Sequence, residues 1–295
     1  MKILVIGGSG TIGSKIVRKF AENNNDVIYT YYENKLNVGI EHRLDIRKKD
    51  ETIDLISKIN ADVVIHTAAL TNVDLCETDK KLADSINVTG TENVIIGCQK
   101  INSKIVYIST SFVFDGEKKY SENDNTSPST FYGLTKFKGE EIIKDSNLPF
   151  LILRTDQPYS WIEQWQHTNS VIRVIDSLKI KKIFYEVKDW YNVPTYIPDF
   201  VNATMKLIEL KKEGIFHLSG SDFLSRYDWA RITAQIFQLD PNLIKPINSS
   251  SLNLSAKRVN GNLSNEKLFH ETGIKMMGVK EGLIEMFKIR NSSHK

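Results

Sequence analysis

The sequence has few of the residues that would give a disulfide framework, a membrane span or a metal site. Its 295 residues include two cysteines, Cys76 and Cys98, which are too few for such a framework and fit a reducing cytoplasm. No apolar run approaches the roughly 20 residues that cross a bilayer, and we expect no signal peptide because Met1 leads straight into a predicted strand. The six histidines follow no metal-ligand spacing, so we expect no metal.

The sequence also has no large excess of charge of either sign. The formal net charge is +3, and the basic residues are scattered among acidic ones without a basic stripe or interleaved aromatic side chains. This pattern argues against a nucleic-acid partner. A hydrophobic content of 41% and a charged content of 25% are ordinary for a globular enzyme of one large or two modest domains.

The first motif is a glycine-rich turn. Residues 2–7 form an apolar run that predicts a buried strand, and a helical pattern follows at Ile16, Val17 and Phe20. Glycines three apart between a strand and a helix let the backbone approach a pyrophosphate, whose charge the helix amides face. An empty turn is the alternative. The predicted dinucleotide contacts are Gly7, Ser9, Gly10, Thr11, Ile12 and Gly13.

The second predicted strand, residues 26–31, bears on the choice of cofactor. NAD-binding folds usually place an acidic residue at its end, bonded to the ribose 2′-hydroxyl. Here Thr30, Tyr31 and Tyr32 take that place, and this stretch also contains no arginine to bind a 2′-phosphate. We therefore expect NADP(H), with NAD(H) as the alternative.

Strands and helices alternate through the first half of the chain. We expect a third strand ending at residues 43–46, a helix over 50–59, a strand over 62–66, a long helix over 80–102 and strands ending at Thr110 and Arg154. This alternation predicts an α/β fold with a Rossmann-type doubly wound parallel sheet covered on both faces.

The stretch 109–136 carries the clearest chemical signal. Tyr132 and Lys136 are four residues apart, so a helix would place them on one face. A nearby ammonium favours the phenolate, and we expect Lys136 to lower the pKa of Tyr132. Such a phenol can exchange a proton with a substrate oxygen, to which the Thr110 hydroxyl could also bond. The alternative is an exposed helix pair without a role.

Beyond Arg154 the pattern becomes irregular. Residues 157–167 are aromatic and polar, and shorter helices and strands follow. We expect a Rossmann domain of residues 1–156 and 192–218, and a small, discontinuous α/β substrate-binding domain of residues 157–191 and 219–290. The last helices are expected to be short.

Together these motifs resemble the extended short-chain dehydrogenases/reductases, and within them the dTDP-4-dehydrorhamnose reductases. The resemblance covers nearly the whole chain and is strongest before residue 156. It rests on the glycine turn, the Asn87–Asn93 segment, Ser109–Thr110, Tyr132-x-x-x-Lys136, residues 68–77, 193–196 and 263–268.

The resemblance implies site residues and a reaction. Thr110, Tyr132 and Lys136 would be the catalytic trio, with Lys136 also binding the nicotinamide ribose. Hydride from the nicotinamide would reduce the C4 carbonyl of a nucleotide-activated deoxysugar while Tyr132 protonates its oxygen. Further expected cofactor contacts are Tyr31, Asp45, Ile46, Ala68 and Ala69, and expected substrate contacts are Thr71, Ser111, Phe112, Trp161, Asn169 and Arg258. The family also implies a homodimer.

Departures from the family pattern leave alternatives open. Ser111 stands where the rhamnose enzymes usually have aspartate, and residues 154–167 and 189–192 differ from the usual segments. A 4,6-dehydratase would need a carboxyl pair after Thr110, and an epimerase-reductase a cysteine in the catalytic segment. The remaining alternatives are a non-catalytic NADP-binding subunit, similar to the regulatory subunit of methionine adenosyltransferase, and a reductase or epimerase of another nucleotide sugar. Trp161, Asn169 and Arg258 could equally have only structural roles.

Overall fold

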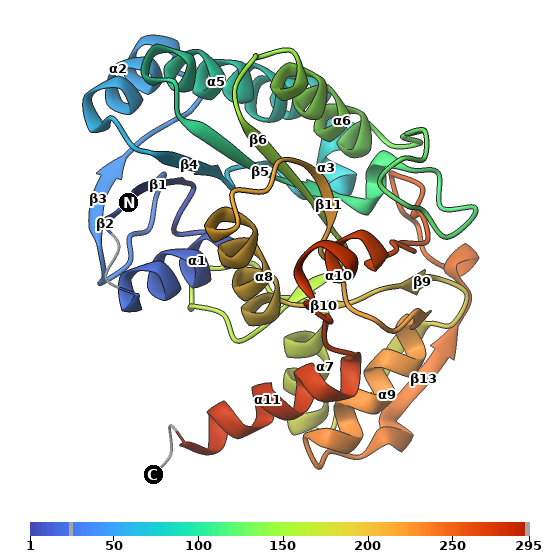
Figure 1. The fold of residues 1–295 in the computed structure, drawn as a ribbon. Coiled ribbons are helices and arrows are strands. Elements are labelled where there is room, and N and C mark those ends of the chain that lie inside the picture. The colour runs from blue at the N-terminus through green and yellow to red at the C-terminus, as the bar shows by residue number, and fades with distance from the viewer. Residues whose placement is uncertain (24–25, 293–295) are drawn as a thin grey trace.

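A seven-stranded parallel sheet forms the centre of the molecule (Figure 1). The computed structural model describes residues 1–23 and 26–292, without the side chains of 290–292. The strand order is β11-β6-β5-β4-β1-β2-β3, which confirms the predicted doubly wound parallel sheet. Its strands are β1 (Lys2–Ile6), β2 (Asp26–Tyr31), β3 (Ile40–Arg43), β4 (Val63–His66), β5 (Lys104–Thr110), β6 (Phe150–Thr155) and β11 (Gly214–His217).

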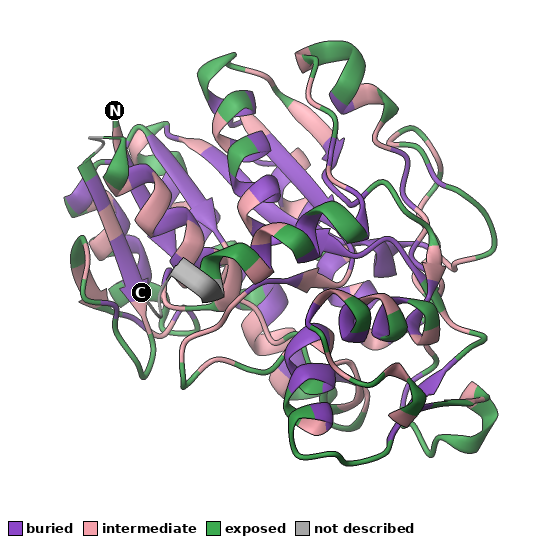
Figure 2. Cartoon of the chain, turned by 90° about the horizontal axis from the view of Figure 1, so that it is seen from below, coloured by how far each residue is buried: buried purple, intermediate pink, exposed green. Residues whose placement is uncertain are grey.

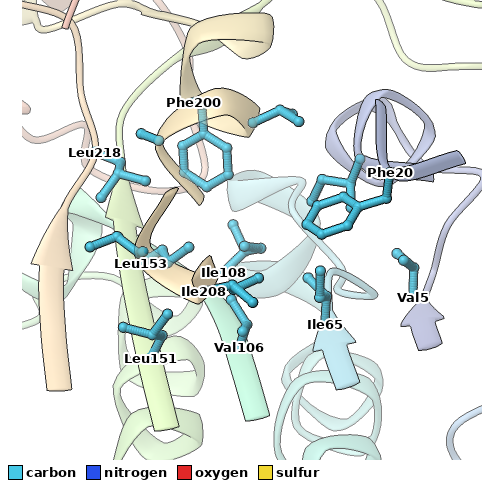
Figure 3. Close-up of a cluster of buried hydrophobic side chains, with 14 of the residues drawn as sticks. Val5, Phe20, Ile65, Val106, Ile108, Leu151, Leu153, Phe200, Ile208 and Leu218 are labelled. Carbon is cyan, nitrogen blue, oxygen red and sulfur yellow. The ribbon is translucent and has the colours of Figure 1, made fainter. Parts of the chain in front are cut away.

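Helices cover both faces of this sheet (Figure 1). One face packs against α1 (Thr11–Glu22) and α8 (Ile197–Glu209), and the other against α2 (Lys49–Ile59), α5 (Gly90–Ile101) and α6 (Phe131–Lys144). Burial on both faces explains why the central strands read as continuous apolar runs, and Figure 2 shows these strands as buried. Figure 3 shows Phe20 of α1 and Phe200 of α8 packed over Val5, Ile65 and Val106.

Two predicted elements differ from the structure. The third strand ends at Arg43, the first residue of the predicted end 43–46, and does not extend to Ile46. The Leu44 amide still donates to the Tyr31 carbonyl, but the Asp45 carboxylate then accepts from the Arg47 amide and turns the chain away. The predicted helix over 80–102 is divided into α4 (Lys80–Asp84), a π-helical turn (Ser85–Thr89) and α5.

The remaining elements form a smaller α/β part below the sheet in Figure 1. Its core is built around Tyr159, Ile175, Trp229 and Leu283. The helix α11 is longer than the short helix predicted there, with 14 residues. The elements are β7 (Pro158–Tyr159), α7 (Ser170–Lys179), β8 (Phe184–Val187), β9 (Tyr191–Asn192), β10 (Thr195–Tyr196), β12 (Leu224–Ser225), α9 (Arg226–Ile236), β13 (Ile244–Ile247) and α11 (Val279–Ser292).

Two further helices lie beside the sheet: α3 (Val73–Thr78) follows β4 and contacts α6, and α10 (Glu266–Thr272) packs against β11. Within residues 1–23 and 26–292, no helix combines the length and apolar character needed to cross a membrane.

Candidate active site

The carboxyl ends of β1, β4, β5 and β6 meet at one edge of the sheet because these strands are parallel neighbours. Ligands of doubly wound folds bind outside this edge. The glycine turn after β1, the loop after β4 and Thr110 at the end of β5 all lie there. These candidate site residues, which are far apart in the sequence, therefore lie together at the carboxyl edge of the sheet.

The geometry of the glycine turn fits a dinucleotide. Gly7 has a φ of 78°, and a Cβ atom there would lie 2.7 Å from the Ala68 nitrogen, so this position requires glycine. The helix α1 has Gly10 as its N-cap and no side-chain hydrogen bond at that cap. The first amides of α1 thus have no side-chain cap and are available to an anion such as a pyrophosphate.

The end of β2 contains a feature that the sequence interpretation missed. The Arg43 Nε donates to the Tyr32 carbonyl over 3.1 Å, and the Arg47 guanidinium lies 3.3 Å from the Tyr32 hydroxyl. Arg47 also forms an ion pair with Asp45 at 2.6 Å, which lowers the pKa of that carboxyl. Two arginines thus lie beside the end of β2, although residues 26–35 contain none. The signal was present in the sequence, because β3 runs parallel to β2 and brings Arg43 opposite Tyr31.

Tyr132 and Thr110 are in contact. The helix α6 begins after Thr130, whose Oγ1 accepts from the Gly133 amide over 3.1 Å. This start places Tyr132 in the first turn, where its phenol interacts with the Thr110 side chain. The Tyr132 ring also meets Phe112 edge-on, with ring centroids 5.6 Å apart. Both the phenol and the threonine are buried.

The expected lowering of the Tyr132 pKa was wrong for this chain on its own. Burial raises the pKa of Tyr132, because it disfavours the phenolate; the Thr110 hydrogen bond acts in the opposite direction, and the Asp156 carboxylate adds to the rise. Burial also lowers the pKa of Lys136 to about 7, opposed by Glu140. The Lys136 ammonium lies 3.9 Å from the centroid of the Tyr107 ring. Tyr132 is thus a protonated phenol, suited to donate hydrogen.

A buried ion pair holds the helix that carries this phenol. Glu140, two turns beyond Tyr132 on α6, accepts two hydrogen bonds from Arg154 of β6, at 2.9 and 2.6 Å. The Ser109 hydroxyl donates to the same carboxylate over 2.6 Å. Both side chains of the pair are essentially inaccessible, with 1% and 0% exposure. The ion pair fixes α6 to β6, and the Ser109 hydrogen bond fixes it to β5, the strand that carries Thr110.

Two further polar side chains support the site. In the π-helical turn, the Asn87 side chain accepts from the Leu70 amide at 2.8 Å and donates to the Leu70 carbonyl and to Thr135 of α6, each at 3.0 Å. Asp156 accepts from the Ser111 hydroxyl at 2.7 Å. The sequence interpretation gave neither Glu140 nor Asp156 a role. Their burial depends on the packed fold, so the sequence alone gave no direct signal for either role.

The structure places three of the expected substrate residues in contacts with other residues of the same chain. The Trp161 indole donates to the Met286 carbonyl over 2.8 Å. Asn169 caps α7, accepting from the Ile172 amide over 3.1 Å. Arg258 forms an ion pair with Asp74. Ser111 and Phe112 lie beside Thr110, whereas Thr71 is exposed after β4.

The remaining expected cofactor contacts line the same edge. Ala68 and Ala69 follow β4 beside the glycine turn. The Ile46 carbonyl accepts from the Asn93 side chain over 2.9 Å. Within residues 1–23 and 26–292, no group of three or more His, Cys, Asp or Glu side chains is arranged to hold a metal.

Comparison with known proteins identifies the family. A family model described as RmlD substrate binding domain matches residues 1–291. The chain belongs to this family. The resemblance to extended short-chain dehydrogenases/reductases is thereby confirmed.

The individual relatives include a reductase and a subunit of another enzyme. The chain is 30% identical over 238 residues to the dTDP-4-dehydrorhamnose reductase of Aggregatibacter actinomycetemcomitans, covering 78% of this chain and 76% of the relative. It is 26% identical to methionine adenosyltransferase 2 subunit beta of Rattus norvegicus, covering 96% and 87%. The crystal structure of dTDP-4-dehydrorhamnose reductase from Bacillus anthracis in complex with NADP has a TM-score of 0.88 at 26% identity, covering 98% of this chain and 100% of that one.

Proposed function

We propose that this protein is an NADPH-dependent reductase of the C4 keto group of a nucleotide-activated deoxysugar, with dTDP-4-dehydrorhamnose as the substrate. The single observation that carries the proposal is the buried Tyr132 phenol, which lies with Thr110 at the sheet edge where the glycine turn lies. Its raised pKa keeps the proton available for transfer to an oxygen on which charge develops.

Each residue of the trio has a defined task in this reaction. The bound nicotinamide supplies the hydride. Tyr132 donates its proton to the sugar oxygen, and Thr110 hydrogen-bonds the same oxygen as negative charge develops. Lys136 binds the nicotinamide ribose, and its positive form favours the phenolate that remains on Tyr132.

We further propose that the two parts of the molecule bind different ligands. Residues 1–156 and 192–218 would bind the dinucleotide, and residues 157–191 and 219–290 the nucleotide sugar. Arg43 and Arg47 support NADP(H) over NAD(H), because a guanidinium can pair with a 2′-phosphate. The family pattern supports a homodimer in the cytoplasm.

The test is turnover by the purified protein. NADPH absorbance should fall on addition of dTDP-4-dehydro-L-rhamnose. Tyr132→Phe should lower kcat about a hundredfold to ten-thousandfold, the usual range for losing general acid catalysis, while NADPH binding is retained. Tyr185→Phe, an exposed phenol, is the matched control. No oxidation of NADPH or NADH across a panel of nucleotide ketosugars, or full activity of Tyr132→Phe, would contradict the proposal.

A second candidate function follows from one relative. The similarity to methionine adenosyltransferase 2 subunit beta allows a non-catalytic, cofactor-binding subunit. The contact between Tyr132 and Thr110 argues against it, because binding alone needs no proton donor there. NADPH binding without turnover, together with capture of a stoichiometric protein partner, would favour this second function.

A further inference from the structure

The loop 161–168 belongs to the part of the chain expected to bind substrate, yet it lies across the glycine turn. The Gln166 Nε2 donates to the Ser9 carbonyl over 2.9 Å and to the Ser14 hydroxyl over 3.0 Å. The Trp165 indole nitrogen lies 3.5 Å from the same Ser9 carbonyl. One loop thus reaches the turn through two neighbouring side chains, from more than 150 residues away in the sequence.

The loop is held in this position at its base. Glu163 forms an ion pair with Arg18 of α1 at 2.8 Å. Within the loop, the Gln166 amide donates to the Glu163 carbonyl over 3.0 Å, and the Gln166 Oε1 accepts from the Glu163 amide over 3.1 Å. Three polar atoms of Gln166, its Nε2, its Oε1 and its backbone nitrogen, thus take part in four hydrogen bonds, and its side chain has one defined direction.

Gln166 connects the two sides of the anion-binding segment. Ser9 precedes the first helical amides, and Ser14 follows them in the first turn of α1. A peptide unit is planar, so fixing the direction of the Ser9 carbonyl also fixes the plane that leads into Gly10. Preorganised amides bind an anion more tightly, because less ordering is needed on binding.

We propose that Gln166 is a positioning residue of the dinucleotide site, which sets the affinity for the pyrophosphate-containing cofactor by bracing the glycine turn. Trp165 lies at the same carbonyl with 41% of its surface exposed and provides an aromatic cover for that side of the site. This inference rests on the proposed function only in taking a dinucleotide as the ligand. It assigns to loop 161–168 a role in cofactor binding in place of the substrate role expected from sequence.

The test measures cofactor binding without turnover, by titrating the full-length protein with NADPH and following NADPH fluorescence. Gln166→Leu should weaken binding about tenfold, the effect of losing one or two net hydrogen bonds. Gln166→Glu should weaken it further, because a carboxylate would face both the Ser9 carbonyl and the pyrophosphate. Gln164→Leu, at an exposed glutamine of the same loop, should leave affinity unchanged.

A second ligand distinguishes an effect of Gln166 on the glycine turn from an effect on the binding of the nicotinamide. The 2′-phospho-ADP-ribose fragment contains the pyrophosphate and lacks the nicotinamide, and Gln166→Leu should weaken it by the same factor as NADPH. Equal NADPH affinity of Gln166→Leu and the unmodified protein would overturn the inference and leave the proposed function intact. Failure of the unmodified protein to bind NADPH would overturn both. If Gln166→Leu is poorly folded, Gln166→Met, which keeps the length of the side chain and lacks the amide, decides the question.

Discussion

The Ser111 hydroxyl donates to the buried Asp156 carboxylate over 2.7 Å, joining the ends of the neighbouring strands β5 and β6. The other carboxylate oxygen accepts from the Asn192 side chain and the Val193 amide, each at 3.0 Å. Asp156 therefore links the strand end beside Thr110 to the segment that leads into β10. Burial raises the pKa of the Asp156 carboxyl, and these hydrogen bonds oppose that rise.

This relationship predicts that the two residues can be exchanged but not altered singly. Ser111→Asp should destabilise the protein, because two carboxylates would share one buried site. The double variant Ser111→Asp/Asp156→Ser restores one carboxylate and one hydroxyl, so it should be more stable than Ser111→Asp. Urea unfolding measures the stability of the single and of the double variant. A double variant no more stable than the single one would contradict the pairing.

The buried pair between Arg154 and Glu140 should dominate the stability of the catalytic helix. Arg154→Met leaves the Glu140 charge buried without its partner, which should cost about 3–5 kcal/mol of unfolding free energy. Arg154→Met/Glu140→Gln should recover part of this loss. The control is Lys144→Ala, which breaks the exposed pair with Glu141 on the same helix and should cost less than about 1 kcal/mol. Similar losses in both single variants would contradict this account.

The stability of the cofactor-free protein should rise with pH above neutrality because of Lys136. Burial lowers the pKa of Lys136 from 10.5 to about 7, so between these values the unfolded chain binds more protons than the folded one. Unfolding free energy therefore increases with pH across this window. Urea unfolding at several pH values between about 7 and 9, where the tyrosines stay protonated, should show a steeper rise than in Lys136→Met. Identical pH dependence in the two proteins would contradict the prediction.

Cofactor preference should depend on Arg47. Arg47→Ala removes a guanidinium beside Tyr32 and should weaken NADPH binding about tenfold, while NADH binding stays the same. The control is Lys48→Ala, which removes a neighbouring cation paired with Glu51 at 2.9 Å. Titration with both reduced cofactors checks this. A parallel loss of NADH affinity would show that Arg47 acts on the fold and not on the 2′-phosphate.

Local patterns in the sequence were sufficient to predict the parallel sheet and to bring the glycine turn and Tyr132 to one edge. Periodicity and glycine spacing are short-range signals, and tertiary packing reinforced them here. The contacts of Trp161 and Arg258 could not be predicted in this way, because their partners Met286 and Asp74 lie 125 and 184 residues away. The pKa of Tyr132 was also inaccessible, because the burial that raises it depends on the packed fold.

The π-helical turn at Ser85–Thr89 has a consequence for how this chain tolerates insertions and deletions. Removing one residue from the turn would allow ordinary α-helical hydrogen bonding throughout. If only backbone hydrogen bonding mattered, this deletion would stabilise the helix. The same deletion would rotate one half of the helix against the other by about 100°, so that Asn87 would lose Leu70 or α5 would lose its contact with α2. The extra residue fixes how far α5, which packs against the sheet, is rotated relative to Asn87, which supports the active site.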